Sequence, residues 1–205
     1  MYSKLEATWR YAHALQREIA GSCFLKENCH PSRSIEKKPG RYYELGNTLF
    51  VGEETHVVDL GKRREGTIPF HTHPMVRGKK FNPPSGEDIM RFIYQRLASN
   101  DQFPMFVLAA EGIYIVHIEQ TLLDRLIKDI ENASDNKILT WKEKVITQIN
   151  QRIAKIRDDP KHNTIDQLRA FLQDIEIAMT LIPWRDPDIN RIRNSYIGEQ
   201  FGRRI

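Results

Sequence analysis

Apolar positions in the first 120 residues follow two different spacings. From Leu5 to Ile19 they recur at steps of three and four, as on one face of an amphipathic helix that can end at Gly21. A second helical pattern begins at Ser85. The other segments are short runs rich in aromatic and β-branched residues and bounded by turn residues, which indicates strands. These runs are SCFL, YYELGNTLFVG, THVVDLG, GTIPFHTHP, PMFVLAA and IYIVHI.

The order of these elements predicts the fold class. Helix, strands, helix and strands in succession are typical of an α/β or α+β domain, in which helices flank a mixed sheet. We expect this domain to cover residues 1–120, because no strand pattern is recognised after Ile118.

Helical spacing continues after Gln120 and predicts a helical extension over residues 121–182. Pro160 lies in a turn that lets the second and third helices form a hairpin. We expect this hairpin to pack on the preceding domain, on itself or on a protein partner, and residues 183–205 to form an irregular basic tail. The three apolar faces are Leu122, Leu123, Leu126, Ile127 and Ile130; Trp141, Val145, Ile149, Ile153 and Ile156; and Ile165, Leu168, Leu172, Ile175, Met179 and Ile182.

Composition narrows the function classes. The chain of 205 residues is 40% hydrophobic and 28% charged, which is typical of a globular protein. Its net charge of +4 comes from interspersed charges without a basic stripe, so nucleic-acid binding is not expected. No apolar run approaches the length of a membrane span, and no membrane association is expected. Two cysteines without a signal-type segment predict an intracellular site, cytoplasmic or nuclear, although carriage inside a virus particle stays open.

The candidate chemistry lies in residues 70–90, FHTHPMVRGKKFNPPSGEDIM. Residues two apart in a strand point to the same side, so His71 and His73 project together. Imidazole suits zinc, and a catalytic zinc site takes three protein ligands, for which Asp88 is the natural third. A second interpretation is that the histidines only end a strand and that Ser85 to Asp88 only form a capping box.

These residues resemble the signature of the JAMM, or MPN+, family of metalloproteases. His71-Thr72-His73-Pro74 is similar to the family's H-[ST]-H-P, and the segment from Ser85 to Asp88 is similar to its S-x-x-D. Glu18 begins a segment, EIAG, that resembles the E-x-x-G of the family. The resemblance covers roughly residues 5–120, with a loop between histidine and serine that is about four residues longer than usual in the family.

The resemblance implies an MPN-like domain with a curled sheet and a zinc ion held by His71, His73 and Asp88. It implies that Glu18 is the general base and that Ser85 stabilises the oxyanion. The activity would be that of a zinc metallopeptidase or isopeptidase that cleaves an amide bond, with ubiquitin or a ubiquitin-like protein as substrate. An alternative is a catalytically silent MPN-fold scaffold or protein-binding module. The other candidates for the base are Glu44, Glu53, Glu54 and Glu87.

Overall fold

The computed structural model describes residues 4–27, 41–51, 67–75, 81–99, 102–132, 135–159, 161–162 and 164–184. The first elements are α1 (Lys4–Leu15), β1 (Ile19–Glu27), β2 (Arg41–Val51), β3 (Thr67–Thr72), α2 (Gly86–Leu97), β4 (Met105–Leu108) and β5 (Gly112–Ile118). They are followed by α3 (Gln120–Glu131), α4 (Asp135–Asp158), α5 (Ile165–Asp174) and β6 (Ile177–Pro183). The mixed α/β fold class is therefore confirmed.

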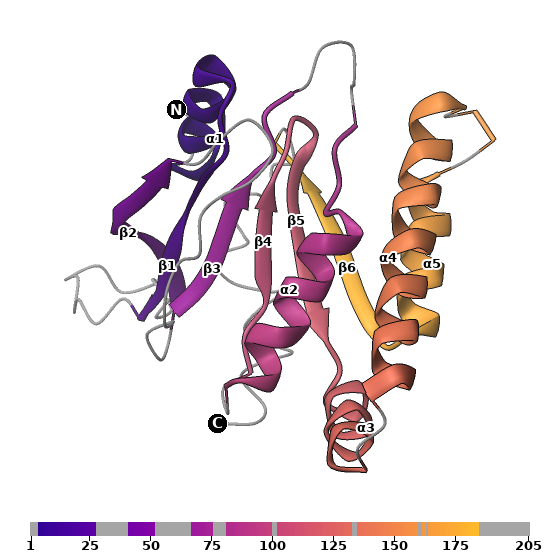
Figure 1. The fold of residues 1–205 in the computed structure, drawn as a ribbon. Helices are drawn as coiled ribbons and strands as arrows, with labels where there is room; N and C mark the ends of the chain where they lie inside the picture. The colour runs from indigo at the N-terminus through magenta and orange to yellow at the C-terminus, as the bar shows by residue number, and fades with distance from the viewer. Residues whose placement is uncertain are drawn as a thin grey trace, which may run out of the picture.

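Six strands form one sheet in the order β2-β1-β3-β4-β5-β6 (Figure 1). β3 and β4 run parallel, whereas the other neighbouring strands run antiparallel, so the sheet is mixed as predicted. A parallel pair needs a crossover connection, and α2 lies within the connection between β3 and β4. α2 is therefore the element that follows β3 in the chain and crosses the sheet to β4.

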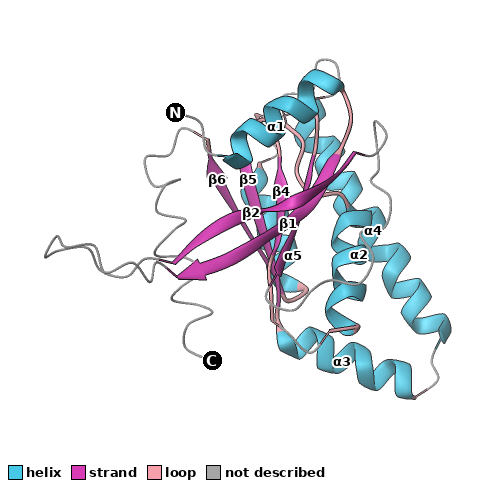
Figure 2. Ribbon diagram, turned by 90° about the vertical axis from the view of Figure 1, so that its left-hand side faces the viewer, coloured by secondary structure: helices cyan, strands magenta, loops and turns pink. Residues whose placement is uncertain are grey.

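Alternation along the strands divides the core into two layers. Ile68 and Phe70 of β3 pack with Trp9 of α1 on one face of the sheet. Met105 and Val107 of β4 lie on the other face, in the larger cluster that includes residues of α2, α3, α4 and α5. Figure 2 shows α2, α3 and α4 together on one side of the sheet.

The helix α4 packs directly on α2. Ile149 is fully buried in the same cluster as Ile89 and Phe92 of α2. At Gly86, a Cβ atom would lie 2.7 Å from the Cα atom of Ile146, so this close approach of the two helices requires glycine. Of the packing arrangements left open by the sequence, α4 therefore uses packing on the first part of the chain.

The first predicted helix ends earlier than expected. α1 ends at Leu15, and Ile19 is the first residue of β1 rather than the last apolar residue of the helix. Gln16 adopts a positive φ of 52°, which breaks the helical backbone, and the N–H of Arg17 bonds the carbonyl of Ala12. Glu18 consequently lies in the connection to β1, beside the sheet.

The prediction that helix continues to Ile182 is wrong. α5 ends at Asp174, Glu176 has a φ of 62°, and the chain then forms β6. β6 pairs with β5 from Ile177 opposite Ile118 to Pro183 opposite Gly112. Residues 177–182 thus complete the sheet and do not belong to a helical extension.

Some predictions lie outside the described residues, namely the strand THVVDLG and residues 185–205 of the basic tail. In the part of the chain that is described, no helix combines the length and the apolar character needed to cross a bilayer.

Candidate metal centre

β3 positions the two histidines. His71 pairs with Val107 of the parallel strand β4, and the N–H of His73 donates to the carbonyl of Leu108 at 2.8 Å, so strand pairing extends to the second histidine. The side chains of His71 in β3 and of His73 just after it both contact Asp88 of α2, whereas Phe70 packs on the opposite face of the sheet. Their Nε2 atoms lie 3.1 Å apart. The prediction that the two imidazoles project together is confirmed.

The first turn of α2 positions the carboxylate of Asp88. Ser85 is the N-cap residue, and its hydroxyl accepts a hydrogen bond from the N–H of Asp88 at 3.1 Å. In return, the N–H and the hydroxyl of Ser85 both donate to Oδ2 of Asp88 at 2.8 Å. This capping box satisfies N-terminal N–H groups of the helix and fixes the rotamer of Asp88.

The two histidines and the carboxylate converge from β3 and α2. Nε2 of His71 lies 3.3 Å from Oδ1 of Asp88, and Nε2 of His73 lies 3.2 Å from Oδ2. Their ligand atoms all lie within 4.8 Å of one another, so this group could hold a metal ion. Zinc ligands at about 2.0 to 2.1 Å in a tetrahedron are separated by about 3.3 Å. Each imidazole lies at a similar distance from one carboxylate oxygen, His71 from Oδ1 and His73 from Oδ2.

A backbone carbonyl sets the orientation of one imidazole. Nδ1 of His73 lies 3.1 Å from the carbonyl oxygen of Asn82. A carbonyl only accepts, so Nδ1 carries the proton in this contact, and in the neutral ring Nε2 is left with a free lone pair. A contact of this kind is common for metal-binding histidines, because it fixes both the tautomer and the ring orientation.

The pKa values of the ligands reflect their mutual attraction. Burial alone would raise the pKa of Asp88, but His71 and His73 hold the pKa of that carboxyl well below its usual range. Burial alone would lower the pKa of His73, but the carboxylates of Asp88 and Glu18 and the carbonyl of Asn82 together outweigh burial and raise it to about 9. Without a metal, the raised pKa therefore favours the protonated form of His73, and a divalent cation would have to displace the proton from Nε2.

No protein-family model, curated protein or solved structure matches this chain. The resemblance to the JAMM family accordingly rests on the motif residues, and membership of that family stays a prediction.

Glu18 lies close to the three ligands. Ala20 pairs with His71 across β1 and β3, and extending this antiparallel register by two residues brings Glu18 opposite His73. The Glu18 side chain is buried, and burial raises its pKa. The charges of His73 and His71 act in the opposite direction, which places the carboxyl in the electrostatic field of the site. Its role as a base stays a prediction.

Ser85 and the alternative glutamates occupy different positions. The Ser85 hydroxyl donates its proton to Asp88 and so orients this candidate ligand, and oxyanion stabilisation stays a prediction. Glu87 is exposed and binds Asn150, so it points away from the histidines. Glu44 lies on β2 opposite Phe24 of β1. Glu53 and Glu54 lie outside the described residues.

The structure adds supporting residues that the sequence did not reveal. Trp9 of α1 donates from Nε1 to the carbonyl of His73 at 3.1 Å, and the N–H of Ile19 donates to Oγ1 of Thr72 at 2.7 Å. Asn150 of α4 accepts from the N–H of Gly86 at 2.8 Å. These contacts join residues more than fifty positions apart, so no local pattern could have indicated them.

Proposed function

We propose that this protein is a zinc-dependent metallopeptidase or isopeptidase that hydrolyses an amide bond. The observation that carries the proposal is the convergence of His71, His73 and Asp88. The two Nε2 atoms lie 3.1 Å apart, and they lie 3.3 and 3.2 Å from Oδ1 and Oδ2 of Asp88, respectively. Two imidazoles and one carboxylate form the three-ligand donor set typical of catalytic zinc sites, which keep the fourth position for water or substrate.

Each residue of the site would have a distinct task. When bound, zinc supplies Lewis acidity that polarises a carbonyl oxygen and acidifies water. His73 is held by the Asn82 carbonyl and Asp88 by Ser85, so two of the ligands are pre-oriented before metal arrives. Glu18 would take the proton from the attacking water and deliver it to the leaving amine, which is general base followed by general acid catalysis.

The environment of Glu18 supports this assignment. A buried carboxyl whose pKa is raised is a stronger base than an exposed one, so it holds a proton more readily at neutral pH. Glu18 lies two residues before Ala20, the pairing partner of His71, which supports a place beside the candidate ligands without being one of them. Glu87, the alternative whose side chain is described, is committed to Asn150 instead.

The proposed substrate class follows from the family resemblance. JAMM-type enzymes are best known for removing ubiquitin or ubiquitin-like proteins, and the same chemistry would serve on an isopeptide bond here. Contacts between the C-terminal helices and a protein partner are part of the same hypothesis.

The test combines zinc binding with cleavage of a panel of ubiquitin chains and ubiquitin-like fusions, with and without chelator. We expect the protein to bind one zinc ion and the chelator to abolish cleavage. Asp88→Ala should lose zinc, whereas the control His162→Ala should keep it, because the exposed imidazole of His162 contacts the carboxylate of Asp159 and not the candidate site. Purified protein that takes up no zinc on reconstitution would refute the proposal.

A further inference from the structure

Arg157 of α4 binds residues 81 and 82, in the loop whose carbonyl orients His73. Its Nε donates to the carbonyl of Phe81 at 3.0 Å, and its Nη2 donates to Oδ1 of Asn82. The guanidinium thus holds two consecutive residues through two different nitrogens. Only arginine presents donors in such a rigid fork, whereas lysine offers a single charged nitrogen.

Asn82 is held from several directions at once. Its N–H donates to Oε1 of Glu111 at 2.9 Å, and its Nδ2 donates to the carbonyl of Pro74 at 3.3 Å. Glu111 is itself fixed by the hydroxyl of Tyr114, which donates to the same oxygen at 2.5 Å. With its own side chain bound by Arg157, Asn82 has little freedom to move its carbonyl away from His73.

We propose that Arg157 is a positioning residue of the metal site, which keeps the Asn82 carbonyl on Nδ1 of His73 and thereby directs Nε2 toward Asp88. The metal part of this inference rests on the proposed function. Arg157 lies on the helix that the sequence assigned to an extension, so α4 would contribute to the site as well as to packing. Removing an outer partner of this type typically lowers metal affinity ten- to hundredfold.

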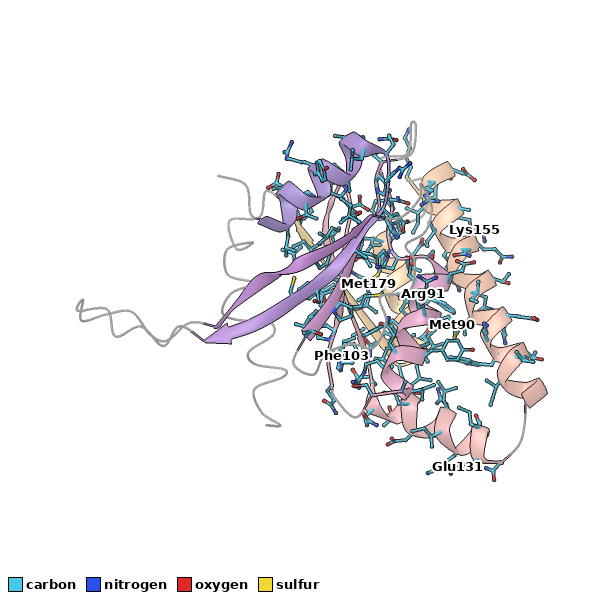
Figure 3. All side chains as sticks on the ribbon, turned by 60° about the vertical axis from the view of Figure 1, so that its left-hand side comes forward. Met90, Arg91, Phe103, Glu131, Lys155 and Met179 are labelled. Atoms are coloured by element: carbon cyan, nitrogen blue, oxygen red, sulfur yellow. The ribbon has the colours of Figure 1, made fainter. Side chains whose placement is uncertain are left out.

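Lys155 provides the matched control. It lies two residues before Arg157 on the same helix and is exposed, and Figure 3 shows it on the outer side of α4. Lys155→Ala removes the same formal charge as Arg157→Ala without touching the loop. Any long-range effect of charge on zinc binding should therefore appear in both variants.

The first readout is zinc affinity, measured by competition with a chromophoric chelator on the full chain. We expect a ten- to hundredfold loss for Arg157→Ala and a change of less than about twofold for Lys155→Ala. Arg157→Lys should give an intermediate loss, because a single nitrogen cannot serve both acceptors. Wild-type affinity in Arg157→Ala, or equal losses in Arg157→Ala and Lys155→Ala, would overturn the proposal.

The second readout needs no metal. The Nδ1 proton of His73 should give an NMR signal protected from exchange in ¹⁵N-labelled wild type and Lys155→Ala, and lose that protection in Arg157→Ala. Should Arg157→Ala fail to fold, Arg157→Lys is measured in the same way. A protected signal in the folded variant would overturn the proposal. If wild type binds no zinc, the proposed function fails, and this measurement still decides the role of Arg157.

Discussion

The side-chain oxygen of Asn150 accepts a hydrogen bond from the backbone N–H of Gly86 at 2.8 Å, two residues before the candidate ligand Asp88. Through its Nδ2 atom, Asn150 also donates to both carboxylate oxygens of Glu87. The side chain of Asn150 thus acts as an additional cap at the N-terminus of α2. The candidate metal site is therefore supported by a side chain that lies 64 positions further along the chain.

Asn150→Ala is expected to lower the free energy of unfolding by about 1 to 2 kcal/mol. The N–H of Gly86 loses its partner, and buried donors without a partner cost about that much. Urea unfolding of the metal-free protein measures the effect. The control is Gln151→Ala on the exposed face of the same helix, expected to change stability by less than about 0.5 kcal/mol. Equal stability of the two variants would show that the contact contributes nothing.

Substitutions of Asp88 separate ligation from capping. In Asp88→Asn the side-chain oxygen can still accept a hydrogen bond from the N–H of Ser85. Asp88→Ala removes this acceptor, so it should be less stable than Asp88→Asn by about 0.5 to 2 kcal/mol. Both variants should lose most of the zinc affinity, because the anionic ligand is gone. Zinc titrations and metal-free unfolding are compared. Zinc binding at wild-type strength in either variant would exclude Asp88 as a ligand.

Glu18→Gln is expected to retain zinc and fold while losing turnover by about 10² to 10⁴-fold, the usual contribution of a general acid or base. The amide fills the same space in the buried position but cannot take a proton. Turnover of the substrate found in the ubiquitin panel and zinc content are measured side by side. Glu87→Gln is the control, because Glu87 faces Asn150 rather than the histidines. Unchanged turnover in Glu18→Gln would assign the base to another residue.

Cys23 should be unreactive in the native protein. Its side chain is 1% exposed on β1, and burial raises the pKa of the thiol to about 12. At pH 8 only about one molecule in ten thousand would carry the thiolate, which is the reactive form. In a Cys29→Ser background, a thiol reagent should therefore label Cys23 only after denaturant is added. Rapid labelling of the native protein would show that β1 opens readily.

The candidate site could be predicted because its signals are local. His71 and His73 are two residues apart in a strand, and Ser85 and Asp88 are three apart at the start of a helix, so each pair is set by the geometry of one element. The contacts of Arg157 and Asn150 depend instead on how α4 packs. A single sequence carries no local pattern for that packing.

The last strand was missed because its apolar residues fit two periods. Ile175, Met179 and Ile182 have helical spacing, but Ile175, Ile177, Met179 and Leu181 also alternate, which is the period of a strand. The preceding helix favoured the helical interpretation. The positive φ at Glu176 ends the helix, and β5 offers an edge on which the following residues pair as a strand. That edge exists only in the folded sheet, so the sequence pattern does not reveal it.

Ile177→Ala tests this last strand. Ile177 is fully buried against the helices, so the truncation should lower the free energy of unfolding by about 2 to 5 kcal/mol. Ile127→Ala on α3 is the control, because that side chain is 40% exposed and should cost less than about 1 kcal/mol. Both are measured by urea unfolding without metal. A small effect at Ile177, equal to that at Ile127, would mean that β6 does not cover the edge of the sheet in solution, since truncating a fully buried side chain leaves a cavity that costs stability.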